Sequence, residues 1–285
     1  ATRALQGTLL GFMALGTVLP SGPAAAQNEP APVYHIATAA PNAVARLNPS
    51  EVGPITEVSG AQLRGTMKFD GALRIIGDID GKHLHVVAEH IEVMGAVKGE
   101  NIWLDARAPQ DRNALNIADA TSHDSQIIIH GDVQVTDSRI GAPGTGSVLI
   151  HGHTELFRQS QDYGLGGGHI KGKEVCITGN LYSQQGSSVN ADTFTIGRDL
   201  NGNAFEAYPY THPVTADHPG RTVIGRNIVA NHTVITNAEV AVGGYTYGER
   251  LEFRQQRDGA APPQTAETEC GFEPRADRLP FSARP

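Results

Sequence analysis

The sequence predicts an all-β fold, a single-stranded parallel β-helix (β-solenoid), right-handed, with irregular N- and C-terminal segments. Three observations support this prediction: a short motif recurs along the chain, glycines are abundant, and helix-forming runs are scarce after residue 58. The motif reads apolar-x-apolar-x-Gly-polar-apolar. It occurs in QIIIHGDV from Gln126 and again in SVLIHGHT from Ser147, 21 residues later. A fold of stacked equivalent coils needs such repetition, whereas a catalytic motif seldom does.

Further copies of the motif extend across the middle of the chain. Their first residues are Leu73, Ile91, Ile127, Val148 and Val175, with looser copies from Phe194 and Thr222. Alternating apolar residues indicate half-buried strands, and the glycine marks a turn. Hairpin turns of the Asn-Gly type are nearly absent, so parallel stacking is favoured. We expect Ile127 and Val148 to share one inner column and Ile129 and Ile150 the next. The widest gap, after Ile91, leaves room for a degenerate copy near IWLDA or LNIAD.

The chain divides into four predicted segments. Residues 1–26 have a basic Arg3, an apolar run and a small-residue site ending at Ala26, which are features of a secretory signal peptide. Residues 27–58 form a Pro- and Ala-rich linker or N-terminal cap, residues 59–255 the β-solenoid domain, and residues 256–285 an irregular tail. We therefore expect a secreted or periplasmic protein of the cell surface, with no transmembrane segment.

Composition limits the classes of partner. Of the 285 residues, 39% are hydrophobic and 18% charged, and the formal net charge is −8. Such a chain can bury a core, but it lacks the basic surface of a nucleic-acid binder or a polybasic membrane anchor. Export makes Cys176 and Cys270 candidates for one disulfide, with two unpaired thiols as the alternative.

Two protein families share these turn glycines and apolar alternation. The segment GTMKFDGALRIIGDIDGKHLHVVAEHIEVMGAVKGENIWLDA, from Gly65 to Ala106, resembles bactofilins, which are polymer-forming proteins with a right-handed β-helix. The segment GSSVNADTFTIGRDLNGNAF, from Gly186 to Phe205, is similar to the haemagglutinin-type repeats of secreted filamentous adhesins. These resemblances imply a β-solenoid with a structural or adhesive role, and neither supplies a catalytic residue.

One cluster of residues has the chemistry of a transition-metal site. His130 and His151 occupy the same motif position, and His153 aligns with Asp132. If the coils stack, these four side chains lie on one outer patch and offer imidazole and carboxylate ligands. The alternative is a solvated ladder of outward-facing residues, a reading that also covers His83 and His85. No other cofactor is expected.

Two enzymatic alternatives remain open. A carbohydrate-active β-helix enzyme, a polysaccharide lyase or hydrolase, would need paired carboxylates, and Asp78, Asp132 and Asp199 recur after the motif glycine. Asn also occurs at that position, so turn capping explains the aspartates more simply. A hexapeptide-repeat acyltransferase is suggested by Val223 and Val229, which lie six residues apart. The sequence identifies no catalytic residue.

The longest predicted loop runs from Asn203 to Gly220 and holds Phe205, Tyr208 and Tyr210, which form a candidate binding loop. We expect an exported, non-enzymatic structural or adhesion module of the cell envelope. Its expected partners are a second copy of the chain, a cell-surface polysaccharide or a protein, and not nucleic acid. The carbohydrate-active enzyme is the second hypothesis.

Overall fold

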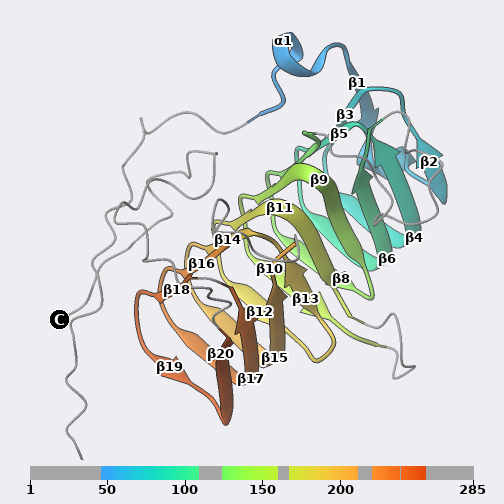
Figure 1. Cartoon of the computed structure of the whole chain (residues 1–285). Helices are drawn as coiled ribbons and strands as arrows, with labels where there is room; N and C mark the ends of the chain where they lie inside the picture. Colours follow the sequence, from blue (N-terminus) through green and yellow to red (C-terminus); the bar gives the residue numbers. More distant parts are fainter. Residues whose placement is uncertain (1–45, 109–123, 160–166, 211–219, 238, 255–285) are drawn as a thin grey trace, which may run out of the picture. The chain divides into compact units, whose positions relative to one another are not determined.

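The computed structural model describes residues 46–108, 124–159, 167–210, 220–237 and 239–254. The predicted signal peptide, most of the predicted linker and the predicted tail lie outside these ranges. The described part is built almost entirely of β-strands (Figure 1). No helix in it is long and apolar enough to cross a membrane.

The N-terminal half of the described chain begins with two short helical turns and continues in long and short strands. In order, these are α1 (Pro49–Val52), β1 (Ile55–Ser59), the 3-10 helix η1 (Gly60–Gln62), β2 (Thr66–Lys68), β3 (Ala72–Ile76), β4 (Ile79–Ala88), β5 (His90–Val93), β6 (Val97–Ala106), β7 (Gln126–Ile129), β8 (Val133–Thr136) and β9 (Arg139–Ile150). The C-terminal half continues with β10 (Thr154–Phe157), β11 (His169–Ile177), β12 (Leu181–Ser183), β13 (Ser188–Asn190), β14 (Thr193–Ile196), β15 (Leu200–Tyr208), β16 (Arg221–Ile224), β17 (Ile228–Thr236), β18 (Glu239–Val242), β19 (Thr246–Tyr247) and β20 (Arg250–Arg254).

The strands that carry the motif pair with one another in parallel, as predicted. Leu73 of β3 pairs with Ile91 of β5, which pairs with Ile127 of β7, so the register follows the spacing of the motif. Ile129 of β7 pairs with Ile150 of β9, and neither side chain is exposed. The two predicted inner columns are therefore confirmed.

The expected degenerate copy of the motif is not found near IWLDA. Strand β5 pairs directly with β7, although Ile91 and Ile127 lie 36 residues apart in the sequence. The IWLDA residues belong to β6, which pairs with β4, β8 and β9. The LNIAD residues lie outside the described part of the chain.

The prediction of an open, single-stranded β-helix is wrong, because the strands form one continuous sheet that closes on itself. All described strands belong to a single 20-stranded sheet. Within it, successive parallel pairings run β6–β8–β10–β12–β15–β13–β11–β9 and then return to β6. The eight strands of this ring make a closed parallel β-barrel, in which every strand of the ring has two neighbours.

The closure depends on long strands that continue around corners. Strand β6 pairs with β8 through Val97–Glu100 and with β9 through Trp103–Asp105. The backbone takes positive φ values near the end of the first stretch, 141° at Gly99, and just after it, 54° at Asn101. Glycine and asparagine tolerate this region, so the strand changes direction without losing its ladder. A glycine in a strand pattern usually indicates a strand end, so closure was not predicted.

The motif glycines have a second role, in the stacking of one turn on the next. A Cβ atom added to Gly131 would lie 2.8 Å from the carbonyl oxygen of Gly95, and one added to Gly179 would lie 2.5 Å from that of Gly152. Real Cβ atoms do not approach so closely, so the turns stack backbone against backbone. The recurring glycine of the motif is thus a packing requirement of the turns.

Apolar side chains fill the interior of the barrel. Most are aliphatic residues from alternate strand positions, and the largest are Phe194 and Phe205, whose rings lie 5.9 Å apart. Full burial of such side chains supplies most of the driving force for folding. A smaller apolar cluster lies on the outer side of the motif strands and includes Leu47, Ile128, Leu149 and Cys176.

Candidate functional site

One outer column of the barrel combines aromatic, cationic and polar side chains. Its members occupy paired outward positions on β4, β6, β9, β11 and β13, namely His85, Trp103, Arg139, His169 and Ser188. We call this column the Trp103 face. Side chains alternate along a strand, so the residue after each position points inward. The inward neighbours Val86, Leu104 and Ile140 are accordingly buried.

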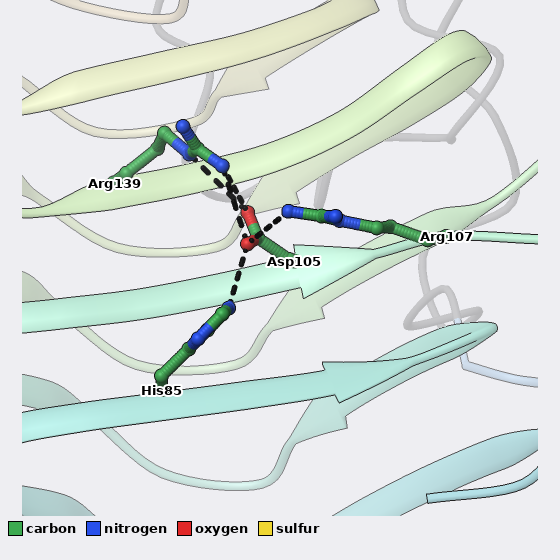
Figure 2. A network of polar contacts seen from close by, with 4 residues as sticks. All are labelled: His85, Asp105, Arg107 and Arg139. Carbon is green, nitrogen blue, oxygen red and sulfur yellow. Dashed lines mark hydrogen bonds and ion pairs between the residues drawn. The ribbon is translucent and has the colours of Figure 1, made fainter. Parts of the chain in front are cut away.

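A fully buried aspartate lies beside the Trp103 face. Asp105 has no exposed side-chain surface, and its carboxylate is 2.8 Å from Nε2 of His85 and 2.9 Å from Nη2 of Arg107. Arg139 adds contacts of 3.2–3.3 Å from its Nε and Nη2 atoms. Figure 2 shows the carboxylate between the imidazole ring and the two guanidinium groups. Asp105, on β6, thereby joins side chains from the two neighbouring strands β4 and β9 and from Arg107, which follows β6.

The surroundings of Asp105 fix its charge. Burial on its own would raise the pKa of this carboxyl, but the hydrogen bond with His85 and the charges of Arg139 and Arg107 outweigh burial and hold the pKa below its ordinary value of 3.8. The group is therefore ionised at neutral pH. An ionised carboxylate only accepts hydrogen bonds, so Nε2 of His85 carries the proton in this contact.

The same network holds the indole ring of Trp103. The centroid of the His85 ring is 5.4 Å from that of Trp103, with the two planes at 71°. On the other side, the guanidinium carbon of Arg139 lies 5.4 Å from the centroid of the indole ring, a cation–π distance. Trp103 remains 38% exposed. A large aromatic surface is thus held in place at the outside of the barrel.

Positive charge continues along the neighbouring strand. The Nζ atom of Lys171 lies 5.0 Å from the centroid of the Tyr210 ring, and the N–H of Gly144 donates to the Tyr210 hydroxyl over 2.8 Å. Burial and the charge of Arg139 both lower the pKa of Lys171. Burial, followed by Arg139, also lowers the pKa of His169, and Asp137 opposes this effect. Arg139 therefore repels further positive charge at two neighbouring strand positions.

A second buried carboxylate belongs to the motif strands. Glu92 of β5 is not exposed, and its oxygens lie 2.7 Å from Nε of Arg74 and 2.9 Å from Nε2 of His130. Burial alone would raise the pKa of Glu92, but the hydrogen bonds with His130 and Arg74 lower it below its ordinary value of 4.5. The ring of His130 stacks on that of His151 at 5.3 Å. The contacts of Arg74, Glu92, His130 and His151 therefore link four successive turns.

The predicted metal ligands are only partly brought together. His130 and His151 stack, as their shared motif position implies, but the Asp132 carboxylate accepts the backbone N–H of His153 at 2.8 Å. The Nδ1 atom of His153 in turn accepts the N–H of Asn180 at 3.0 Å. Among the residues that the structure describes, no group of three or more His, Cys, Asp or Glu side chains is placed to hold a metal ion.

The aspartates that the carbohydrate-active enzyme would need instead accept hydrogen bonds from backbone N–H groups of the turns. Asp78 accepts the N–H of Ala96 at 2.7 Å, and Asp199 accepts the N–H of Asn227 at 3.1 Å. Asn180 and Asn227 make the equivalent bonds to the next turn. We call this series of side-chain-to-backbone bonds, one turn to the next, the cap ladder. The ladder explains why Asp, Asn and His share the position after the motif glycine.

The predicted binding loop is wrong in its first half. Phe205 is a fully buried core residue of β15, because the alternation of that strand points it inward. Tyr208 ends the same strand and donates to Glu206 at 2.5 Å; burial, followed by this bond, raises the pKa of Tyr208 to about 12. Tyr210 contacts Lys171, as described above. Residues 211–219 lie outside the described part.

Of the two cysteines, Cys176 lies on β11 and is 4% exposed. No cysteine in the described part of the chain is free. Cys270 lies outside that part, so its pairing with Cys176 remains a prediction. The outward direction expected for Cys176 agrees with its place in the outer apolar cluster, but its low exposure was not foreseen.

Sequence reasoning assigned no role to Trp103, Asp105 or Arg139, and it grouped His85 with surface histidines. Comparison of the chain with known protein families, with curated proteins and with solved structures finds no match. The resemblances to bactofilins and adhesin repeats are therefore neither supported nor refuted by relatives.

Proposed function

We propose that this protein is an exported, non-enzymatic adhesion or binding module of the cell envelope, and that its ligand is a glycan lying along the Trp103 face. The observation that supports this most directly is the indole of Trp103, which is 38% exposed and whose position is fixed by contacts with His85 and Arg139. The C–H face of a pyranose ring packs well on an aromatic ring whose position is fixed beforehand. His169 and Ser188 line the same column, and Nδ1 of His169 lies 2.9 Å from Oγ of Ser188.

Binding is favoured over hydrolysis because the carboxylates of Asp105, Asp132 and Asp199 already accept hydrogen bonds from other groups of the protein. Asp105 is fully buried, ionised and surrounded by cationic partners, so it cannot reach a ligand or donate a proton at neutral pH. Asp132 and Asp199 accept backbone N–H groups in the cap ladder. Glycoside hydrolysis needs two accessible carboxyl groups, one of them with a raised pKa.

Export is supported by the signal-peptide features of residues 1–26, which lie outside the described part. A polysaccharide lyase is the second candidate, and one observation favours it. Burial and Arg139 lower the pKa of Lys171, and an amine with a lowered pKa can abstract a proton next to a sugar carboxylate. In the favoured proposal Lys171 only binds.

Affinity electrophoresis of the chain from Gln27 onward against a panel of neutral and acidic polysaccharides tests the proposal. We expect retardation by at least one glycan without release of products. Trp103→Ala should weaken this binding by about tenfold or more, as loss of an aromatic contact does. Tyr247→Ala is the matched control, because Tyr247 is 70% exposed but lies on β19, away from the face.

Two results would contradict the proposal. Binding that is equally weakened by both substitutions would not involve the Trp103 face. Release of unsaturated products that disappears with Lys171→Gln would establish the lyase.

A further inference from the structure

We propose that the glycan of the Trp103 face is acidic, with a carboxylate bound by Arg139 and Lys171 while a neighbouring sugar ring stacks on Trp103. This inference rests on the proposed function and adds the chemical class of the ligand. It is argued from the unused hydrogen-bonding edge of Arg139, from the local excess of positive charge and from the spacing of the strands.

The guanidinium of Arg139 is only partly used by the protein. Its Nε and Nη2 atoms contact Asp105, whereas Nη1 makes no hydrogen bond to any residue that the structure describes. The side chain is 28% exposed. Asp105 therefore holds the guanidinium in one orientation and leaves two N–H groups for a ligand. Each of these N–H groups of Nη1 can donate a charge-assisted hydrogen bond to an oxygen of a carboxylate.

The charge around Arg139 is positive on balance, although the whole chain has a net charge of −8. Among the described residues, Arg107 and Arg139 contact the buried carboxylate of Asp105, and Lys171 adds a third positive charge near Arg139. The second nearby carboxylate, Asp137, lies beside His169 and accepts the N–H of Gly167 at 2.7 Å. Burial first, and then the charge of Arg139, lower the pKa values of Lys171 and His169. An anionic ligand would relieve this repulsion.

The spacing of the Trp103 face matches a chain of sugars. Neighbouring strands lie about 4.8 Å apart, close to the rise of one sugar residue in an extended glycan. Trp103 and Arg139 are paired positions on adjacent strands, and His169 is the next position along. One sugar on the indole thus places the next sugar, with its carboxylate, at Arg139.

Charge complementarity and strand spacing therefore favour a carboxylated polysaccharide over other polyanions. The probes are polygalacturonate, its fully methyl-esterified form of equal chain length, and a single-stranded oligonucleotide of equal charge. The esterified form keeps the sugar rings and loses the charge. The oligonucleotide keeps the charge and offers bases for stacking, but has no carboxylate.

We expect isothermal titration to show binding of polygalacturonate about tenfold tighter than binding of its ester, as befits a charge-assisted contact. Arg139→Gln should reduce this preference to about twofold or less. Lys171→Gln, which does not touch Asp105, should reduce it in part and serves as a second variant if Arg139→Gln fails to fold. Lys98→Gln is the matched control, because it removes one positive charge from the opposite end of β6.

The outcomes separate this inference from the proposed function. Equal binding of the acid and the ester, lost in Trp103→Ala, would overturn the acidic ligand and keep the glycan-binding face. Binding of the oligonucleotide as tight as that of polygalacturonate would show a general polyanion site and overturn the inference. Absence of binding to every glycan would overturn both proposals.

Discussion

The Nε2 atom of His85 lies 2.8 Å from Oδ2 of Asp105, which belongs to the next strand of the sheet. His85 contacts Trp103, and Asp105 holds Arg139, whose guanidinium lies over the indole ring. The buried carboxylate is therefore expected to contribute both to stability and to the shape of the Trp103 face.

The first prediction is that Asp105→Asn destabilises the protein by about 3–5 kcal/mol, the usual cost of removing one partner from a buried ion pair. The substitution deprives the guanidinium groups of Arg107 and Arg139 of this carboxylate. Urea unfolding followed by circular dichroism measures the loss. Asp80→Asn, at an exposed position of β4, is the control and should change stability by less than about 0.5 kcal/mol. Similar losses in both variants would contradict the role of Asp105.

The second prediction concerns the paired core residues of β7 and β9. Ile129→Ala and Ile150→Ala should each cost about 2–5 kcal/mol through lost burial and a cavity. The two side chains touch the same part of the core. The free energy of unfolding that the double variant loses should therefore differ from the sum of the losses in the two single variants. Val229→Ala, at a position that is 36% exposed, should cost far less. Thermal unfolding of the four variants would decide, and unaffected stability in Ile129→Ala would contradict the register.

The third prediction compares two glycines that pair across neighbouring strands. Gly99 has a φ of 141°, and a Cβ atom there would overlap the carbonyl oxygen of Gly81. Nothing lies within 4 Å of the position a Cβ would take on Gly81. We expect Gly99→Ala to destabilise the protein by more than about 1 kcal/mol, and Gly81→Ala to have little effect or to stabilise slightly. Equal melting temperatures for the two variants would refute the close approach.

The fourth prediction is a loss of stability in acid. The folded-state pKa values of Asp105 and Glu92 lie below their ordinary values of 3.8 and 4.5, so the unfolded chain binds protons first as the pH falls. Their contribution is complete above those ordinary values and is lost as the pH falls towards the lower folded values. Urea midpoints measured from pH 7 to pH 3 should decline at the acidic end, and less steeply in Glu92→Gln. If the urea midpoint of Glu92→Gln falls with pH as steeply as that of the parent protein, Glu92 does not contribute to the loss of stability in acid.

The fifth prediction is the Cys176–Cys270 bridge. The loop it would close spans about 95 residues, for which chain entropy gives roughly 4–5 kcal/mol. Alkylation of the native protein is a poor test, because Cys176 is 4% exposed and even a free thiol at this position would react slowly. Intact mass after denaturation without reductant is decisive. A bridged chain takes up no alkylating agent until it is reduced, whereas uptake at two thiols would exclude the bridge.

The register of the motif strands could be predicted from the sequence because the apolar alternation and the turn glycine recur together. The same residue spacing also relates the members of the Trp103 face to one another. The step of 18 residues from Leu73 to Ile91 also leads from His85 to Trp103, and the step of 36 from Ile91 to Ile127 leads from Trp103 to Arg139. This column was missed because its members share no chemical type, so no repeated pattern indicates them.

Closure of the barrel and the place of Phe205 were missed for different reasons. Closure depends on the backbone conformation of residues such as Asn101, which has a positive φ. An asparagine can adopt this conformation but does not require it, so the residue type alone does not predict the corner. Phe205 was assigned to a loop because Tyr and Pro follow it. Its alternation with Glu206 and Ala207 was a strand signal that the aromatic content of the segment obscured.

The cap ladder makes alignment of the turns independent of their length. Each bond joins a side chain just after one motif to the backbone just after the next, whether 18 residues separate the two positions, as for Asp78 and Ala96, or 28, as for Asp199 and Asn227. Segments between consecutive caps can therefore gain or lose residues while the strands keep their partners. The barrel should accept guest peptides grafted between β15 and β16, inside the step from Asp199 to Asn227, and displayed sequences could diversify there without a redesign of the scaffold.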